Sequence, residues 1–176
     1  MSRFLSLATK LCGRAAILGV ALGASGSALA ANASVKQVRG PIWVTVPTAA
    51  SPLQSIAVKA PGNGNLIVTV TGTANYEHTL GSQGYYCLQL ANVSAYVGGC
   101  TPNAGSDSAV RASVAAGFPT TTPNMGASEQ YSIVRTWPVT AGTTYTFYLN
   151  GSESGFDAMW LFQPSITAVY VPGTMP

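Results

Sequence analysis

Short stretches of alternating apolar and polar residues, separated by glycine and proline turns, are what most constrain the fold of this chain. In residues 66–73, for example, Leu66, Val68 and Val70 share one parity, and threonine recurs in the other. Successive side chains of a strand point to opposite faces of a sheet, so this period of two predicts a half-buried strand. Segments of the same kind recur along the chain, with turn residues between them.

The pattern predicts about nine or ten short strands, over residues 42–46, 51–59, 66–73, 85–90, 94–97, 109–116, 129–139, 143–150, 156–162 and 165–171. Residues 74–80 either continue the third strand or form a partner to it. We therefore expect an all-β fold of one domain: an antiparallel β-sandwich with jelly-roll-like or Greek-key connections. An outer-membrane barrel is the competing architecture, and the eleven prolines disfavour it.

Charged residues make up only 7% of the chain. Solvent-exposed helices normally carry Glu and Lys on their outer faces, whereas strands favour β-branched and aromatic residues, so this composition also favours an all-β fold. Within it, the Thr140-Ala141-Gly142 turn between two alternating segments predicts a β-hairpin over residues 129–150.

Residues 1–30 have the features of a secretory signal peptide. They contain three basic residues, an apolar run, and the small residues Ala28 and Ala30 at the cleavage position. We expect cleavage after Ala30, which leaves a secreted β-sandwich domain over residues 31–176, either extracellular or periplasmic. An uncleaved anchor is the alternative.

Cleavage changes the charge balance of the chain. Three of the eight Lys and Arg lie in the leader, so five bases face five acids and the mature charge is zero. A nucleic-acid partner is therefore not expected, because it would need a basic patch. A chain without net charge has little colloidal repulsion, so a homo-oligomer remains open.

The mature chain keeps two cysteines, Cys87 and Cys100. An even pair in an oxidising compartment predicts a disulfide. The segment between them has the pattern strand, turn, strand, and we expect the bridge to close a local hairpin.

Catalytic signals are few. His78 is the single histidine, and no Gly-x-Ser-x-Gly elbow is present, so we interpret His78 as a surface or edge residue and do not expect an enzyme. Glu153 and Asp157 form the closest pair of carboxylates, which could serve glycoside cleavage, but solvated turn residues are the favoured interpretation.

No cofactor is expected, although calcium remains open. Calcium takes oxygen ligands from loops, and Asp107, Glu153 and Asp157 lie in loop-like segments of suitable composition. None of these segments has an EF-hand spacing. Zinc would need more His or free Cys ligands than the mature chain has.

Aromatic residues give the strongest lead to a ligand. Trp43 opposes the aliphatic parity of its segment and Tyr96 lies near a turn, so we expect both to be exposed. Exposed Trp and Tyr rings can stack on sugars while their polar groups form hydrogen bonds.

Three functional classes follow from these observations. The first is a secreted, non-enzymatic binding or adhesion module whose partner is a carbohydrate or another cell-surface component. The alternative is a structural or self-assembling extracellular protein. A second alternative is a glycan-active enzyme. Sandwich folds support all three, so the sequence alone does not separate them.

Overall fold

The computed structural model describes residues 34–79, 81–94, 109–117 and 127–173. Within these ranges the chain forms nine β-strands. Their bounds are β1 Val35–Arg39, β2 Trp43–Thr45, β3 Ser51–Lys59, β4 Gly64–Glu77, β5 Gly84–Ala91, β6 Ala109–Val114, β7 Ala127–Val139, β8 Thr144–Ser154 and β9 Ala158–Pro172.

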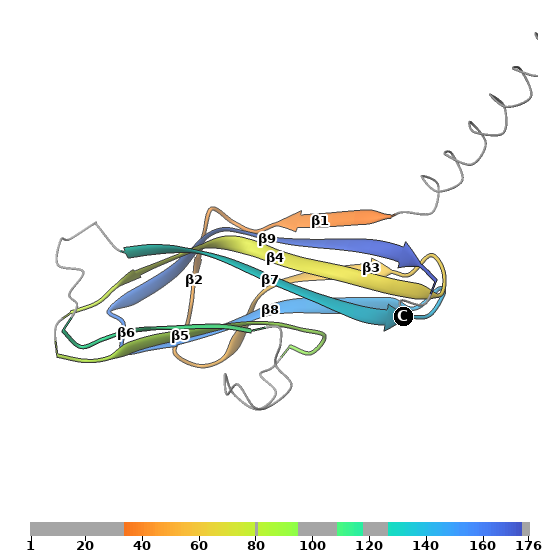
Figure 1. Cartoon of the computed structure of the whole chain (residues 1–176). Helices are drawn as coiled ribbons and strands as arrows, with labels where there is room; N and C mark the ends of the chain where they lie inside the picture. Colours follow the sequence, from red (N-terminus) through yellow and green to blue (C-terminus); the bar gives the residue numbers. More distant parts are fainter. Residues whose placement is uncertain (1–33, 80, 95–108, 118–126, 174–176) are drawn as a thin grey trace, which may run out of the picture. The chain divides into compact units, whose positions relative to one another are not determined.

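The strands form two antiparallel sheets that pack face to face (Figure 1). The five-stranded sheet has the order β1-β9-β4-β7, with β2 also paired to β9, and the four-stranded sheet has the order β3-β8-β5-β6. The pairs are nested along the chain: β5 with β6, β4 with β7, β3 with β8, and β1 and β2 with β9. A long hairpin wound into two sheets gives this order, so the fold is the predicted jelly-roll sandwich.

The core lies between the sheets and follows the alternation of the strands. Leu66, Val68 and Val70 of β4 face inward with 0% exposure, as do Phe147 and Leu149 of β8. Full burial of each such side chain stabilises the fold by about 1.5–3 kcal/mol. The sequence pattern therefore placed the inward faces of these strands correctly.

Most predicted strands are confirmed, and β3 has the predicted bounds. Residues 74–77 continue β4, which settles the alternative left open for that segment. One strand, β1, was not predicted. It pairs along β9 from Val35 opposite Val169 to Arg39 opposite Ser165, and its five residues are mostly exposed, so it carries little apolar periodicity.

The predicted β7–β8 hairpin is wrong. β7 pairs with β4 and β8 pairs with β3 and β5, so the turn at residues 140–142 carries the chain from one sheet to the other. Gly142 N–H donates to the Ala60 carbonyl at 2.8 Å, and Ala60 N–H donates to the Thr143 carbonyl at 2.9 Å. A short glycine turn suits a sandwich corner as well as a hairpin, and the local sequence does not distinguish the two.

The two strands predicted at residues 156–162 and 165–171 are one strand, β9, with a bulge at its centre. Across the bulge, Thr71 pairs with Ser165 and Thr73 pairs with Phe162, so one residue of β4 opposes two residues of β9. The bulge lets the strand bend without ending. The sequence signal Gln163-Pro164 was therefore real, but it marks an irregularity within a strand.

β5 is buried on both faces, whereas its alternation predicted a half-buried strand. Cys87 and Gln89 face away from the core and are still only 6% and 7% exposed. The outer face is covered where the chain leaves β5: the Asn150 side-chain amide, itself 0% exposed, donates to the Val93 carbonyl at 3.1 Å.

Several predicted features lie outside the described residues. They are the leader at residues 1–30, most of the second strand of the disulfide hairpin, and Cys100. The Cys87–Cys100 bridge, the cleavage site and secretion therefore stay predictions. Within the described ranges, no helix is long and apolar enough to cross a membrane.

Gly155→Ala should destabilise the fold more than Gly142→Ala. Both glycines have φ in the left-handed region, +80° and +76°, which costs a non-glycine residue about 1–2 kcal/mol. A Cβ at Gly155 would also collide with the Gln83 carbonyl oxygen, whereas a Cβ at Gly142 meets no atom within 4 Å. Urea denaturation should show the larger loss for Gly155→Ala, and equal losses would contradict the placement of this turn.

Candidate functional site

Trp43 lies on the outer side of the five-stranded sheet. It belongs to β2, a three-residue strand in which Val44 turns toward the core while its neighbours turn outward. The Trp43 side chain is 55% exposed, which confirms its predicted exposure. Its one described ring contact is with Phe162 of β9, at a centroid distance of 4.8 Å and an interplanar angle of 52°.

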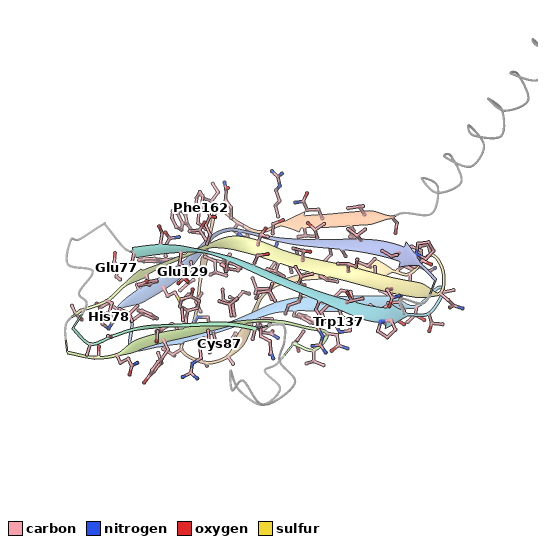
Figure 2. The ribbon with its side chains drawn as sticks, in the orientation of Figure 1. Glu77, His78, Cys87, Glu129, Trp137 and Phe162 are labelled. Carbon is pink, nitrogen blue, oxygen red and sulfur yellow. The ribbon has the colours of Figure 1, made fainter. Side chains whose placement is uncertain are left out.

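The strand registers place further side chains beside this pair. Trp43 is opposite Phe162, Phe162 is opposite Thr73 of β4, and Thr73 is opposite Gln130 of β7. Residues directly opposite each other on one face have Cβ atoms about 4.5–5.5 Å apart, so the four form a row across the sheet. Figure 2 shows Phe162 on the outer side of the sheet, away from the other sheet.

A second row lies beside the first, displaced from it by two residues on each strand. It consists of Thr45, Trp160, Asn75 and Ser128. We call the two rows together the aromatic face: Trp43, Thr45, Thr73, Asn75, Ser128, Gln130, Trp160 and Phe162. The aromatic face joins three aromatic rings to hydroxyl and amide side chains, and it contains no charged residue.

A hollow of about 460 Å³ adjoins the aromatic face at the β9 bulge. Its lining combines two aromatic residues with hydroxyl and amide groups, and none of the lining residues is charged: Thr71, Gly72, Thr73, Gln130, Tyr131, Ser132, Phe162 and Gln163. This volume lies within the range of about 300–1,000 Å³ that small-ligand pockets occupy.

The hollow depends on an unusual backbone at Gln163. Its φ of +47° is the one left-handed value of a non-glycine residue in the described part of the chain. Such a conformation costs about 1–3 kcal/mol and often marks a functional site. Two hydrogen bonds hold the bulge: Gln163 N–H donates to the Ile42 carbonyl at 2.9 Å, and Gly40 N–H donates to the Pro164 carbonyl at 2.7 Å.

Tyr131 lies beneath the hollow, on the inner side of the sheet. Its ring occupies the space that a side chain at Gly72 would fill, because a Cβ there would come within 2.5 Å of the Tyr131 hydroxyl. Burial raises the pKa of Tyr131, and its hydroxyl has no hydrogen-bond partner among the described residues. The Gly72–Tyr131 pair thus gives the hollow a packed floor.

Arg39 is a cation on the same side of the sheet. It is exposed, and it stands opposite Ser165, in the row beyond the bulge from Trp43. Arg39 does not line the hollow, so its charge would act only at the margin of the aromatic face.

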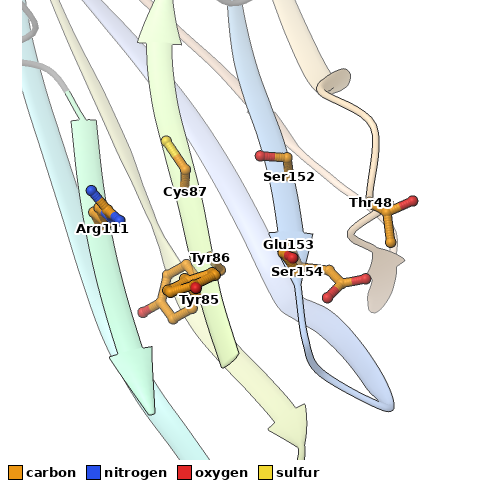
Figure 3. Close-up of a pocket in the computed structure, with 8 residues that line it drawn as sticks. All are labelled: Thr48, Tyr85, Tyr86, Cys87, Arg111, Ser152, Glu153 and Ser154. Atoms are coloured by element: carbon orange, nitrogen blue, oxygen red, sulfur yellow. The ribbon is translucent and has the colours of Figure 1, made fainter. Parts of the chain in front are cut away.

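A second groove, of about 340 Å³, lies on the four-stranded sheet (Figure 3). Arg111 of β6 borders it on one side of β5, and residues 152–154 of β8 border it on the other. The Arg111 guanidinium is 5.8 Å from the Tyr85 ring centroid, within cation–π range. The groove combines charged and polar groups with the partly exposed Tyr85.

Predicted site residues lie in several separate places. Trp43 belongs to the aromatic face, and Glu153 lines the second groove. The Glu153 carboxylate accepts from the Phe156 N–H at 3.4 Å, whereas that of Asp157 accepts from the Thr79 hydroxyl at 3.0 Å. The structure thus gives the two acids different partners. Tyr96 and Asp107 lie outside the described residues.

His78 is buried, so its interpretation as a surface or edge residue is wrong. It is 1% exposed, and its ring packs edge-on against Phe156 with the centroids 5.8 Å apart. His78 follows β4 directly, and the connection from β8 to β9 turns Phe156 in over it. Phe156 is far from His78 in the sequence, so the polar residues next to His78 do not indicate that it is buried.

A carboxylate and a phenol meet where β7 passes over β5. The Tyr86 hydroxyl donates to Glu129 Oε2 at 3.0 Å. Burial, followed by this hydrogen bond, raises the pKa of Tyr86, so the phenol stays protonated and acts as a donor. Among the described residues, no three His, Cys, Asp or Glu side chains form a group that could hold a metal ion.

The sequence pattern indicated Trp43 but not most of the other residues of the aromatic face. Trp160 and Phe162 share a parity opposite to Met159 and Leu161, which are 1% and 0% exposed, and this alternation was visible in the sequence. Thr73 and Gln130 carried no comparable signal, because only the pairing of β4 with β9 and β7 brings them beside the rings.

No protein-family model matches the chain. No curated protein matches it either. Comparison with solved structures gives similarities at low identity. The infectious bursal disease virus Gx strain structure is 14% identical with a TM-score of 0.41, and the match covers 82% of this chain and 33% of that one. The Eiger TNF structure from S. frugiperda is 13% identical with a TM-score of 0.36, covering 82% and 94%.

A third similar structure is that of the Bacillus endospore appendages, described as disulfide-linked pili. It is 14% identical with a TM-score of 0.30, and the match covers 80% of this chain and 91% of that one. This chain spans about a third of the length of the viral protein. The strand order and the registers of this chain establish its fold without reference to these structures.

Trp43→Ala should leave the fold nearly intact, whereas Trp137→Ala should not. Trp43 is 55% exposed, and losing its contact with Phe162 should cost about 1 kcal/mol of the free energy of unfolding. Trp137 is 8% exposed and packs on Phe147 at 4.6 Å, so its loss should cost about 3–5 kcal/mol. Denaturation of both variants measures this, and a large loss for Trp43→Ala would contradict an outward, unburied ring.

Proposed function

We propose that this protein is a secreted, non-catalytic jelly-roll module that binds carbohydrate through the aromatic face. One observation carries the proposal: Trp43, more than half exposed, stands in register with Phe162, Thr73 and Gln130. The signal peptide and the Cys87–Cys100 disulfide, both predictions from the sequence, agree with an extracellular setting.

The chemistry of the aromatic face matches a sugar. The C–H surface of a sugar ring is apolar and stacks on an aromatic ring, while its hydroxyls need hydrogen-bond partners. Trp43 and Phe162 supply the rings, and Thr73 and Gln130 supply a hydroxyl and an amide that both donate and accept. A neutral surface of this kind suits sugar hydroxyls better than it suits an ionic partner.

The positions of the carboxylates favour binding over hydrolysis. Glycoside hydrolysis uses two carboxyl groups on either side of one bond. Glu129, Glu153 and Asp157 instead accept hydrogen bonds from three different groups: Tyr86 hydroxyl, Phe156 N–H and Thr79 hydroxyl. Each carboxylate therefore has a role within the fold.

Retention on polysaccharides tests the proposal. The mature protein should be retained by at least one member of a panel of insoluble polysaccharides, and Trp43→Ala should weaken binding by about tenfold or more, which corresponds to about 1.4 kcal/mol. Running the panel with calcium and with a chelator tests whether loop carboxylates contribute.

Tyr148→Ala is the matched control for this experiment. Tyr148 is a partly exposed aromatic residue on the outer side of the four-stranded sheet, so its loss removes a ring of similar size from the opposite face. Equal weakening by Tyr148→Ala, or no retention of the unaltered protein on any polysaccharide, would contradict the proposal.

Self-assembly is the second candidate function, and the β7 edge is the observation that favours it. β7 has thirteen residues and pairs only with β4 among the described strands, so its other edge can accept a strand. Two copies of β7 paired antiparallel about Ser132 would place Glu129 of each copy opposite Arg135 of the other. Opposite charges in facing positions stabilise such a pair.

Charge reversal tests this second candidate. Sedimentation of the mature protein should show a concentration-dependent dimer, Arg135→Glu should weaken it, and Arg135→Glu combined with Glu129→Arg should restore it. Because the Glu129 change also removes the bond to Tyr86, the stability of each variant is measured alongside. A protein that stays monomeric at all concentrations would contradict pairing through β7.

A further inference from the structure

We infer that the aromatic face takes a single neutral polysaccharide chain and not the flat surface of a crystalline polysaccharide. The inference rests on the carbohydrate-binding function proposed above, and it names the physical form and charge of the ligand. The angle between the rings, the hollow beside them and the charge of the lining residues support it.

The angle between Trp43 and Phe162 excludes flat stacking by both rings. Their planes are inclined by 52° and their centroids are 4.8 Å apart, so the rings form a corner. Stacking requires atoms of the ligand within about 3.5–4.0 Å of the ring atoms. If one ring lies parallel to a flat surface, the other is turned out of that plane and loses its contact. A single chain can turn between successive sugars and contact both rings.

The hollow is a site that a single polysaccharide chain can enter. It begins at Phe162, and its walls carry the side chains of Thr73, Gln130 and Gln163. A rigid flat surface would cover the rim of the hollow and leave these polar groups without partners, which is unfavourable once water is excluded. A flexible chain that enters the hollow can form hydrogen bonds with them.

The row has the length for more than one sugar. Trp43, Phe162, Thr73 and Gln130 lie on four neighbouring strands, β2, β9, β4 and β7. Neighbouring strands are about 4.8 Å apart, so the row spans about 14 Å. A short stretch of polysaccharide crossing the strands would therefore contact the Trp43 and Phe162 rings at one end of the row and Gln130 at the other.

The lining of the hollow favours a neutral chain. None of its eight residues is charged, and Arg39 stands in the row beyond the bulge. Salt screens interactions between exposed charges over about 10 Å at 0.1 M ionic strength, so it would weaken the binding of a charged ligand. The binding of a neutral ligand should depend little on salt.

Competition between soluble and crystalline forms of one polymer tests the inference. The probes are the hexasaccharides of β-1,4-glucose and of β-1,4-N-acetylglucosamine, each compared with crystalline cellulose or chitin. We expect the mature protein to bind a hexasaccharide in titration calorimetry, with a Kd that changes less than twofold between 0.05 and 0.5 M salt, as expected for uncharged contacts. Phe162→Ala and Gln130→Ala should each weaken binding at least about threefold, and Tyr148→Ala should not.

The outcomes separate the inference from the function on which it rests. Retention on a crystalline polymer that the matching hexasaccharide does not displace would overturn the inference and leave carbohydrate binding intact. Binding that is lost at 0.5 M salt or with Arg39→Gln would replace the neutral chain with an acidic one. Binding to neither form of either polymer would overturn both the inference and the proposed function. Melting temperatures of all variants identify any loss that reflects unfolding.

Discussion

The antiparallel pairing of β4 with β9 is the constraint on which the rest of the structure depends. It joins the middle of the chain to its C-terminal strand and places both strands at the centre of the five-stranded sheet. β7 is added on one side of this pair, and β1 and β2 on the other. The one irregularity in the pairing, opposite Gly72, is also where the hollow forms, so the candidate site and the central ladder have a common origin.

The register of the β4–β9 pairing determines which side chains of the two strands face the core and which face outward. Leu161 and Ala74 are paired and face the core with 0% exposure, and the residues next to them, Phe162 and Thr73, are paired on the outer face. A shift of the pairing by one residue would exchange the two sets. The core therefore fixes the register of the aromatic face, since burial of the apolar side chains holds the exposed rings in place.

The sequence predicted what depends on local pattern and missed what depends on pairing. The bounds of β3, the inward parity of Leu66 and the exposure of Trp43 follow from alternation within one segment. The partner of β7 does not, because a turn such as 140–142 fits a hairpin and a sandwich corner equally well. For the same reason the burial of His78 by Phe156, and the place of Gln130 beside the aromatic rings, required the three-dimensional structure.

The most direct test of the central claim uses the three tryptophans of the chain. Their indole N–H groups give separate NMR signals, and their positions differ: Trp43 is 55% exposed, Trp160 lies in the neighbouring row, and Trp137 is 8% exposed in the core. On titration with a soluble neutral hexasaccharide, the Trp43 signal should shift most, that of Trp160 less, and that of Trp137 should stay in place. A saturating shift at Trp137 with none at Trp43 would place the ligand elsewhere and contradict the account.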